Sequence, residues 1–249
     1  MSKTKIISFA NHKGGVGKTT TVASVGSILA GMGKNVLLID LDAQSNLTAS
    51  LLKNEPETSI YTALIGKGGL PVVEVTDHLY LSPASLQLAM ADLELSSAMA
   101  REKILSDLIN EVKDQYDYIL IDCPPSLGLL TLNAFTASTD IIIPMVAEVL
   151  PFKGLTMINT FIGMVSKRLN PAAHITGILI TRWENNNLSK EIESMLREKT
   201  GDLVFTTKIR KNVSLAEAPL SSKNIVEYAP SSNGAQDYKT FVTELLERL

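Results

Sequence analysis

Short runs of isoleucine, valine and leucine recur along the chain, separated by stretches in which apolar residues repeat at the spacing of a helix. Apolar runs of this kind are typical of strands that are buried on both faces of a parallel sheet. The pattern predicts five such strands, at residues 5–10, 35–40, 117–123, 140–146 and 175–181.

The segment between the first two predicted strands has the periodicity of a helix. Its apolar positions are Val22, Val25, Leu29 and Met32. Gly33 follows where a helix C-terminus favours glycine. The same spacing predicts further helices at residues 85–114, 127–138, 152–169, 188–200 and 234–248.

This alternation predicts an α/β fold in one domain spanning residues 1–249, a doubly wound and mostly parallel sheet with helices on both faces. A chain of 249 residues with 45% hydrophobic content can fill one large core. The glycine- and proline-containing stretch 53–76 is the most loop-like part. The N-terminal residues lead into a strand rather than a signal peptide, so we expect a cytoplasmic protein.

A glycine-rich motif joins the first predicted strand to the first predicted helix: residues 11–20 read NHKGGVGKTT. The amides of Gly14, Gly15 and Gly17 can close around phosphate oxygens, and the helix N-terminus adds a partial positive charge. This strand–loop–helix context is the one that a phosphate-binding P-loop requires. The alternative is a glycine-rich turn that only caps a helix.

The residues after these glycines supply the expected ligands of ATP and Mg²⁺. Lys18 would contact the β- and γ-phosphates, Thr19 would ligate magnesium, and Thr20 could hydrogen-bond the α-phosphate. The sequence therefore predicts a magnesium-dependent ATPase with the P-loop NTPase fold. The predicted nucleotide contacts in this loop are Lys13, Gly14, Gly15, Val16, Gly17, Lys18, Thr19 and Thr20.

The loop departs from the ordinary G-x-x-x-x-G-K-[ST] pattern, because His12 stands in place of the first glycine and Lys13 follows it. In KGGVGKTT the first lysine resembles the signature lysine of the ParA and MinD ATPases. The resemblance implies that Lys13 crosses a homodimer interface and neutralises charge on the partner's transferred phosphoryl group, a catalytic role. The alternative is a surface lysine beside a complete P-loop.

Two acids end the second predicted strand, which reads LLIDLDAQSN. Since side chains alternate along a strand, Asp40 and Asp42 project to the same side at its carboxyl end, where ligands of open α/β sheets bind. ParA-type sequences are similar here and commonly read DxDPQ, with proline where this chain has Ala43. That resemblance implies that Asp42 positions the attacking water and that Asp40 holds magnesium-bound water. Alternatively, both are ordinary acids at a strand end.

A third acid, Asp122, closes the run YDYILID just before Cys123, Pro124 and Pro125. An apolar strand that ends in aspartate is the Walker B arrangement, so we expect Asp122 to hold a water on magnesium. The two prolines keep the next loop out of the sheet, as a nucleotide-sensing switch requires. We expect Cys123 to be a small buried filler rather than a nucleophile.

The segment KIRKNVSLAEAP, residues 208–219, resembles a ParA-family stretch that often reads IPRNVxLxEAP. The resemblance implies an adenine pocket here, with Asn212 and the backbone at Arg210 as contacts. Arg210 stands where the family commonly has proline. The alternative for Asn212 is a residue that caps a turn.

The formal net charge of −3 excludes a globally basic nucleic-acid binder, so DNA affinity would need a local patch. The resemblance implies sequence-independent DNA binding by the ATP-bound dimer, and phosphate contacts alone would make it salt-dependent. A solvated face with mixed charges is the alternative. The candidate cations are Arg182, Lys208, Arg210, Lys211 and Lys223.

The last predicted helix has one apolar face, which we expect to pack on the core. This face consists of Phe241, Val242, Leu245, Leu246 and Leu249. A MinD-like membrane anchor would favour lysine and arginine on the polar face, and this helix carries both acids and bases there. Membrane binding is therefore the weaker expectation.

The resemblance to the ParA family implies an ATP-driven DNA-segregation switch, in which nucleotide binding closes a sandwich dimer, the dimer binds the nucleoid, and hydrolysis stimulated by a ParB-like partner releases it. One alternative is a MinD-like membrane-surface regulator, and another is positioning of a protein cargo. An iron-sulfur reductase with the same loop would need paired cysteines, and Cys123 is the one cysteine. A repressor without enzymatic activity would need no nucleotide machinery.

Overall fold

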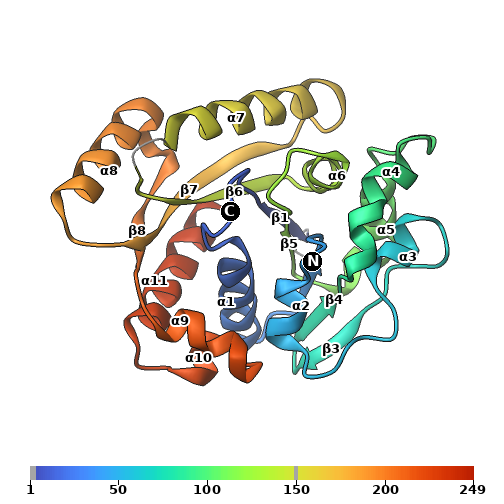
Figure 1. The fold of residues 1–249 in the computed structure, drawn as a ribbon, viewed down its shortest axis with the longest axis horizontal. Coiled ribbons are helices and arrows are strands. Elements are labelled where there is room, and N and C mark those ends of the chain that lie inside the picture. Colours follow the sequence, from blue (N-terminus) through green and yellow to red (C-terminus); the bar gives the residue numbers. More distant parts are fainter. Residues whose placement is uncertain (1–3, 149–150) are drawn as a thin grey trace.

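The computed structural model describes residues 4–148 and 151–249, with the backbone alone for residues 151–153. One eight-stranded sheet, in the order β3-β4-β2-β5-β1-β6-β7-β8, forms its centre (Figure 1). Neighbouring strands pair in parallel, except that β3 runs antiparallel to β4. The strands are β1 (Lys5–Phe9), β2 (Val36–Asp40), β3 (Val73–Thr76), β4 (Leu79–Ser82), β5 (Tyr118–Asp122), β6 (Asp140–Val146), β7 (His174–Trp183) and β8 (Val204–Arg210).

The central strands are buried on both faces, as their uninterrupted apolar sequence predicts. On β2, Leu37 and Ile39 belong to one apolar core, whereas Val36 and Leu38 belong to the other. Helices α3 to α8 cover the first core, and α1, α2, α10 and α11 cover the second. Figure 1 shows α6 and α7 on one side of the strands and α1 and α11 on the other. The predicted doubly wound α/β fold is confirmed.

Helices separate most of the strands along the chain, although β3 and β4 follow each other directly. The α-helices are α1 (Lys18–Gly31), α2 (Asn46–Leu51), α3 (Ile60–Leu64), α4 (Ala91–Leu95), α5 (Ile104–Val112), α6 (Leu129–Ala137), α7 (Pro151–Arg168), α8 (Asn187–Thr200), α9 (Ser214–Glu217), α10 (Ile225–Tyr228) and α11 (Asn233–Arg248). Short 3-10 helices are η1 (Leu86–Met90), η2 (Lys113–Gln115), η3 (Gly201–Leu203) and η4 (Ala218–Ser221). Gly33 has a left-handed φ of 75°, as predicted for the end of α1.

The prediction of one helix over residues 85–114 was wrong. The chain instead forms η1, α4, an irregular stretch, and then α5 and η2, with a left-handed φ of 51° at Ala100 in the irregular stretch. The side chain of Asn133 on α6 stabilises this break. Its Oδ1 accepts from the amide of Leu105 (3.0 Å), and its Nδ2 donates to the carbonyl of Arg101 (2.8 Å). A tertiary contact therefore overrides the local helical pattern.

Residues 53–76 were expected to be loop, and they contain α3 and the edge strand β3 as well. β3 reads VEVT and alternates half-buried with exposed positions, so it lacks the buried apolar run that identified the central strands. Sequence reasoning also missed β4 and β8.

The apolar face of α11 packs on the second core, as predicted. Phe241, Val242 and Leu245 are buried, and Leu246 and Leu249 are partly buried against them. Across residues 4–148 and 151–249, every helix is too short or too polar to span a lipid bilayer.

Candidate nucleotide and magnesium site

The predicted phosphate loop lies at the carboxyl end of β1, in the middle of the sheet, and leads directly into α1. Gly15 and Gly17 have φ angles of 71° and 84°, in the left-handed region that side chains other than glycine rarely adopt. Gly17 ends the loop, and its carbonyl accepts from the amide (2.9 Å) and the hydroxyl (2.7 Å) of Thr21. Two glycines of the motif are therefore required by the backbone itself.

Two neighbouring strands hold the loop in place. Asn11 is buried, and its Nδ2 donates to the carbonyl of Pro144 on β6 (2.8 Å), while its Oδ1 accepts from the amide of Lys13 (3.1 Å). The hydroxyl of Thr181 on β7 donates to the carbonyl of Val16 (2.8 Å). These bonds stabilise the loop before any ligand binds, which lowers the ordering cost of binding.

The two lysines of the motif occupy different environments. Lys18 is 7% exposed, and its Nζ donates to the carbonyl of Lys13 (3.3 Å) inside the loop. The Lys13 side chain is 54% exposed and forms an ion pair with Glu148, just after β6. Thr19 and Thr20 lie half-buried in the first turn of α1. Lys18 thus stays within its own loop, while Lys13 reaches outward.

The predicted carboxylates Asp40 and Asp122 occupy paired positions at the carboxyl ends of β2 and β5. Asp40 is fully buried, and Thr48 of α2 donates to its Oδ2 from both the amide (2.9 Å) and the hydroxyl (2.8 Å). The amide of Asp42 donates to its Oδ1 (3.1 Å). Burial nevertheless outweighs these bonds and raises the pKa of Asp40 from 3.8 to about 6. Through its bonds to Thr48 and to the amide of Asp42, Asp40 holds the loop after β2 in place.

Asp122 is 1% exposed, and among the described residues neither of its carboxylate oxygens accepts a hydrogen bond of standard geometry; a weaker contact with the Thr19 side chain lowers its pKa only in part. Burial raises its pKa well above the ordinary value, and the charge of Asp40 raises it further, while Thr19 and Lys18 act in the opposite direction. A buried carboxylate without a partner is costly. A divalent cation with its waters would supply the missing partners, so Asp122 and Thr19 fit a magnesium site.

Asp42 is half-buried at the start of the loop that leads to α2. Its Oδ1 accepts from the amide of Gln44 (3.0 Å), and its carbonyl accepts from the amide of Ser45 (2.8 Å). This turn forms although Ala43 replaces the proline of similar sequences. Asp42 is thus held in a defined turn on the same edge of the sheet as the phosphate loop.

Cys123, which follows Asp122, is fully buried in the first apolar core. Burial raises the pKa of its thiol, so the thiol is not activated as a nucleophile. The prediction of a small buried filler is confirmed.

The predicted adenine contacts lie after β8 and already have partners. The Oδ1 of Asn212 accepts from the amide of Ser214 (2.8 Å) at the start of α9, which is the turn-capping geometry. Asp237 on α11 accepts from both the amide (2.9 Å) and the guanidinium (2.6 Å) of Arg210. The contact with adenine stays a prediction, and these bonds fix the backbone that would form it.

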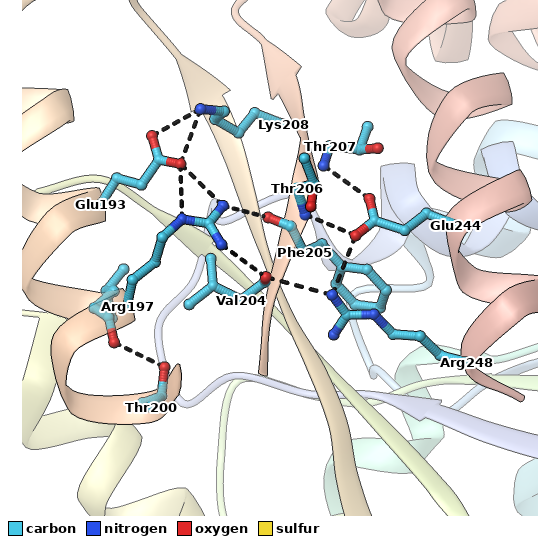
Figure 2. Close-up of polar contacts among 11 residues, drawn as sticks. Glu193, Arg197, Thr200, Val204, Phe205, Thr206, Thr207, Lys208, Glu244 and Arg248 are labelled. Atoms are coloured by element: carbon cyan, nitrogen blue, oxygen red, sulfur yellow. Dashed lines mark hydrogen bonds and ion pairs between the residues drawn. The ribbon is translucent and has the colours of Figure 1, made fainter. Parts of the chain in front are cut away.

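Three of the five candidate DNA-binding cations are held in ion pairs. Lys208 donates to both carboxylate oxygens of Glu193 (2.9 and 2.7 Å) and lies 4.5 Å from the ring centre of Trp183. Figure 2 shows this Glu193 contact together with the one from Arg197. The other pairs are Arg210 with Asp237 and Lys211 with Glu184.

Arg182 and Lys223 are exposed, and within the described residues they form no ion pair. Arg182 has a left-handed φ of 50°. It directly follows Thr181, whose hydroxyl holds the phosphate loop. Lys223 precedes α10. These two side chains are the ones most available to an anionic partner.

Comparison with known proteins agrees with this geometry. A family model described as an AAA domain matches residues 4–175. The chain is 40% identical to the sporulation initiation inhibitor protein Soj of Bacillus subtilis, over 97% of this chain and 98% of Soj. It is 39% identical to the chromosome-partitioning ATPase Soj of Treponema pallidum, over 98% of both chains. The chain belongs to the ParA/Soj family of partition ATPases.

A solved structure also matches this ParA/Soj family member along nearly its whole length. It is the cobyrinic acid a,c-diamide synthase from Mycobacterium smegmatis with bound ADP and magnesium, which is 33% identical. The TM-score is 0.85, and the match covers 98% of this chain and 94% of that one. The P-loop fold predicted from the sequence is therefore shared with a protein whose structure holds a nucleotide and magnesium.

Sequence reasoning missed several residues that build the site of this ParA/Soj protein. Thr181, Asn11 and Thr48 act through contacts with distant segments, and a hydroxyl or amide side chain leaves no distinctive pattern in one sequence. Glu148 was also missed, because its contact with Lys13 joins two residues that are far apart in the sequence. Its position directly after a predicted strand, on the ligand-binding edge, was the available signal.

Proposed function

We propose that this protein is an ATP-dependent DNA-partition ATPase of the ParA/Soj type. It hydrolyses ATP with magnesium, dimerises around the nucleotide and binds DNA without sequence preference in the ATP state. The observation that carries the proposal is the contrast between two lysines of one loop: Lys18 is buried inside it, and Lys13 reaches outward to an exposed carboxylate. Lys18 is placed to bind the phosphates of a nucleotide on its own chain, and Lys13 is placed to contact a second copy of the protein.

The nucleotide would bind on the loop from Lys13 to Thr20, where glycine amides and the N-terminus of α1 meet. Lys18 orients the β- and γ-phosphates. Thr19 is the predicted direct ligand of magnesium, and Asp122 and Asp40 are the predicted holders of its waters. The metal, when bound, would neutralise charge on the phosphates. The unpartnered oxygens of Asp122 are the feature that favours this assignment.

Asp42 would orient the water that attacks the γ-phosphate. Its turn is fixed by bonds to Gln44 and Ser45, and it is half-buried rather than sealed in the core. Lys13 of a second copy would stabilise the charge that develops on the transferred group, an effect worth about 10³ to 10⁵ in rate when a cation is supplied in this way. Hydrolysis would therefore depend on dimerisation.

Exposed apolar side chains around the carboxyl edge of the sheet support a dimer that closes over the nucleotide. They lie in segments that follow the ends of β4, β7 and β8, on the edge of the sheet where the nucleotide would bind, so a second copy that closes over the nucleotide could cover them. They are Leu86, Met90, Leu93, Leu188, Val213 and Leu220.

The dimer would bind the phosphate backbone through exposed cations on each copy, with Arg182 and Lys223 as the leading candidates. Two copies double the number of phosphate contacts, so dimerisation controls DNA affinity. A ParB-like adaptor bound to the cargo would stimulate hydrolysis and release the protein. In the cell, the ATP state would associate with the nucleoid and the ADP state would diffuse in the cytoplasm.

A Lys13→Ala variant tests the dimer. Sedimentation of the wild type with a non-hydrolysable ATP analogue should give a dimer, and its ATPase rate per protomer should rise with protein concentration. Lys13→Ala should bind the analogue but lose both the dimer and the rise in rate. Lys34→Ala, a change at an exposed lysine outside the loop, is the matched control. Normal dimerisation and hydrolysis by Lys13→Ala would reject the proposal that this lysine acts across an interface.

A further inference from the structure

The ion pair between Lys13 and Glu148 holds the proposed catalytic cation within its own chain. The Lys13 ammonium contacts Oε2 of Glu148, and their side chains are 54% and 50% exposed. Among the described residues, the Glu148 carboxylate has no partner besides Lys13. Its amide donates to the carbonyl of Val146 (2.9 Å). The carboxylate is therefore placed by a tight turn directly after β6.

The same segment contacts the phosphate loop at two further points. Pro144 accepts the hydrogen bond from Asn11. Gly154 on α7 lies against the ring of His12, so closely that a Cβ there would be 1.8 Å from the ring Cε1. The loop residues just before the first glycine thus rest on the end of β6 and the start of α7. Glu148 lies between these two contacts in the sequence, so its contact with Lys13 belongs to a larger interface.

We propose that Glu148 is a positioning residue that keeps Lys13 in cis and so delays formation of the active dimer. This inference rests on the proposed trans role of Lys13, because holding Lys13 in cis can delay the active dimer only if Lys13 acts across the dimer interface. To reach a partner's nucleotide, the ammonium must leave the Glu148 carboxylate. ATP can compete for it, since a triphosphate presents more negative charge than one carboxylate. The pair therefore selects for the nucleotide-loaded partner.

The exposure of the pair sets the size of the effect. Ion pairs that are half-exposed to solvent contribute little, about 1.4- to 5-fold in an equilibrium constant. A symmetric dimer breaks two such pairs, so the dimerisation constant would change by about 2- to 25-fold. An effect of this size is small enough for ATP binding to overcome.

The first test measures the pair directly in the nucleotide-free protein. Limited acetylation followed by mass spectrometry reports how readily each lysine reacts, and a lysine held by a carboxylate reacts more slowly. Glu148→Gln should increase labelling of Lys13 severalfold and leave Lys34, an exposed lysine, unchanged. Unchanged labelling of Lys13 would overturn the proposal without reference to any activity.

The second test separates the pair from the dimer. ATPase rate is measured against protein concentration for the wild type, Glu148→Gln, Lys13→Ala and the double variant. Glu148→Gln should lower the concentration that gives the half-maximal rate by about 2- to 25-fold and leave the maximal rate per protomer near the wild-type value. In the Lys13→Ala background, the same substitution should change nothing, because its effect passes through Lys13.

Glu111→Gln is the control for loss of one negative charge. Glu111 is exposed on α5, close to η2, whose residues meet the segment just before β1 at the opposite edge of the sheet from the loop. A half-maximal concentration that stays constant or rises in Glu148→Gln, or an equal shift in both backgrounds, would overturn the proposal. If Lys13→Ala dimerises and hydrolyses ATP normally, the proposed function itself fails. If Lys13→Ala is inactive and Glu148→Gln has no effect, only the role of Glu148 is rejected.

Discussion

Asp40 and Asp122 occupy paired positions on the neighbouring parallel strands β2 and β5, and both carboxylates are buried. Thr48 and the Asp42 amide provide partners for Asp40, whereas Asp122 has none among the described residues. Burial raises the pKa of both groups. The charge of Asp40 raises the pKa of Asp122 further, and the charge of Asp42 does the same to Asp40, because like charges repel. The pair thus destabilises the free chain at the place where a cation is expected.

We predict that Asp122→Asn stabilises the nucleotide-free protein at pH 7.5, because the amide removes a buried charge that has no partner. Relief of one such group is worth about 1–3 kcal/mol. For a chain of this size, each kcal/mol raises Tm by about 2–4 °C. Differential scanning calorimetry checks this. Addition of magnesium and an ATP analogue should reverse the ranking, since the variant loses a holder of the metal's waters.

The pH dependence of that difference follows from the direction of the pKa shift. A carboxyl with a raised folded pKa favours the folded state at low pH, where it is protonated, and this contribution is lost as pH rises through the folded pKa. Asp122→Asn should therefore gain more over the wild type at pH 8 than at pH 5. A constant difference in Tm across that range would contradict the assignment of a buried, unpartnered carboxylate.

Two glycines of α7 allow a controlled test of the contact between that helix and the phosphate loop, because Gly154 makes the contact and Gly163 does not. Gly154→Ala should displace the ring of His12 and weaken ATP binding, because its Cβ would lie 1.8 Å from a ring atom. Gly163→Ala meets nothing within 4 Å and should stabilise the helix by about 0.5–1 kcal/mol. Titration with a fluorescent ATP analogue and thermal melts measure the two effects. Adding His12→Ala to Gly154→Ala should restore affinity.

Glu244 on α11 should make stability depend on acid pH. Its carboxylate accepts from the amides of Thr206 (2.7 Å) and Thr207 (2.8 Å) on the edge strand β8 and pairs with Arg248 (Figure 2). Burial alone would raise the pKa of Glu244, but the bonds to Thr207 and Thr206 outweigh it and lower the pKa. Glu244→Gln should therefore destabilise the protein at neutral pH.

A lowered carboxyl pKa gives stability that is present above the unfolded value of about 4.5 and lost as pH falls through the folded value. The difference in urea midpoint between the wild type and Glu244→Gln should thus shrink below pH 4. Glu247→Gln, at an exposed position on the same helix, is the control and should have little effect at any pH. A loss of stability in Glu244→Gln that persists unchanged at pH 3 would refute the charge-based account.

The cations near β8 should divide into two groups when DNA affinity is measured against salt. Lys223 is exposed and unpaired within the described residues, so Lys223→Ala should reduce the slope of log affinity against log salt by about 2 for a dimer that uses both copies. Lys208 is held by Glu193 and Trp183, so Lys208→Ala should lower stability and leave the slope near the wild-type value. The opposite pattern would indicate that the DNA-binding surface lies on β8.

The central strands and the phosphate loop could be predicted because their signals are local. A buried parallel strand shows an apolar run, and the left-handed backbone at Gly15 and Gly17 requires the residue type that the motif supplies. Asp40 and Asp122 could be placed at strand ends by the same reasoning. Their pairing in register could not, because the order of β2 and β5 in the sheet is set by tertiary packing.

The missed features depend on distant contacts. The helix expected over residues 85–114 is interrupted, and Asn133 stabilises the interruption by binding the backbone of Arg101 inside the break and of Leu105 at the start of α5. The basic segment after residue 207 looked like a free patch, since the acids that pair with it, Glu193 and Asp237, come from other helices. Charge counted along a sequence therefore overstates the charge that is free on the surface.

The most direct test of the central claim is binding to nonspecific duplex DNA with ATP, with ADP and without nucleotide, at two salt concentrations. Wild type and Asp42→Ala are compared by fluorescence anisotropy, because Asp42→Ala should bind ATP without hydrolysing it. We predict salt-sensitive binding with ATP alone, retained or strengthened in Asp42→Ala. Equal DNA affinity in all three nucleotide states, or none in any of them, would contradict an ATP-controlled DNA switch.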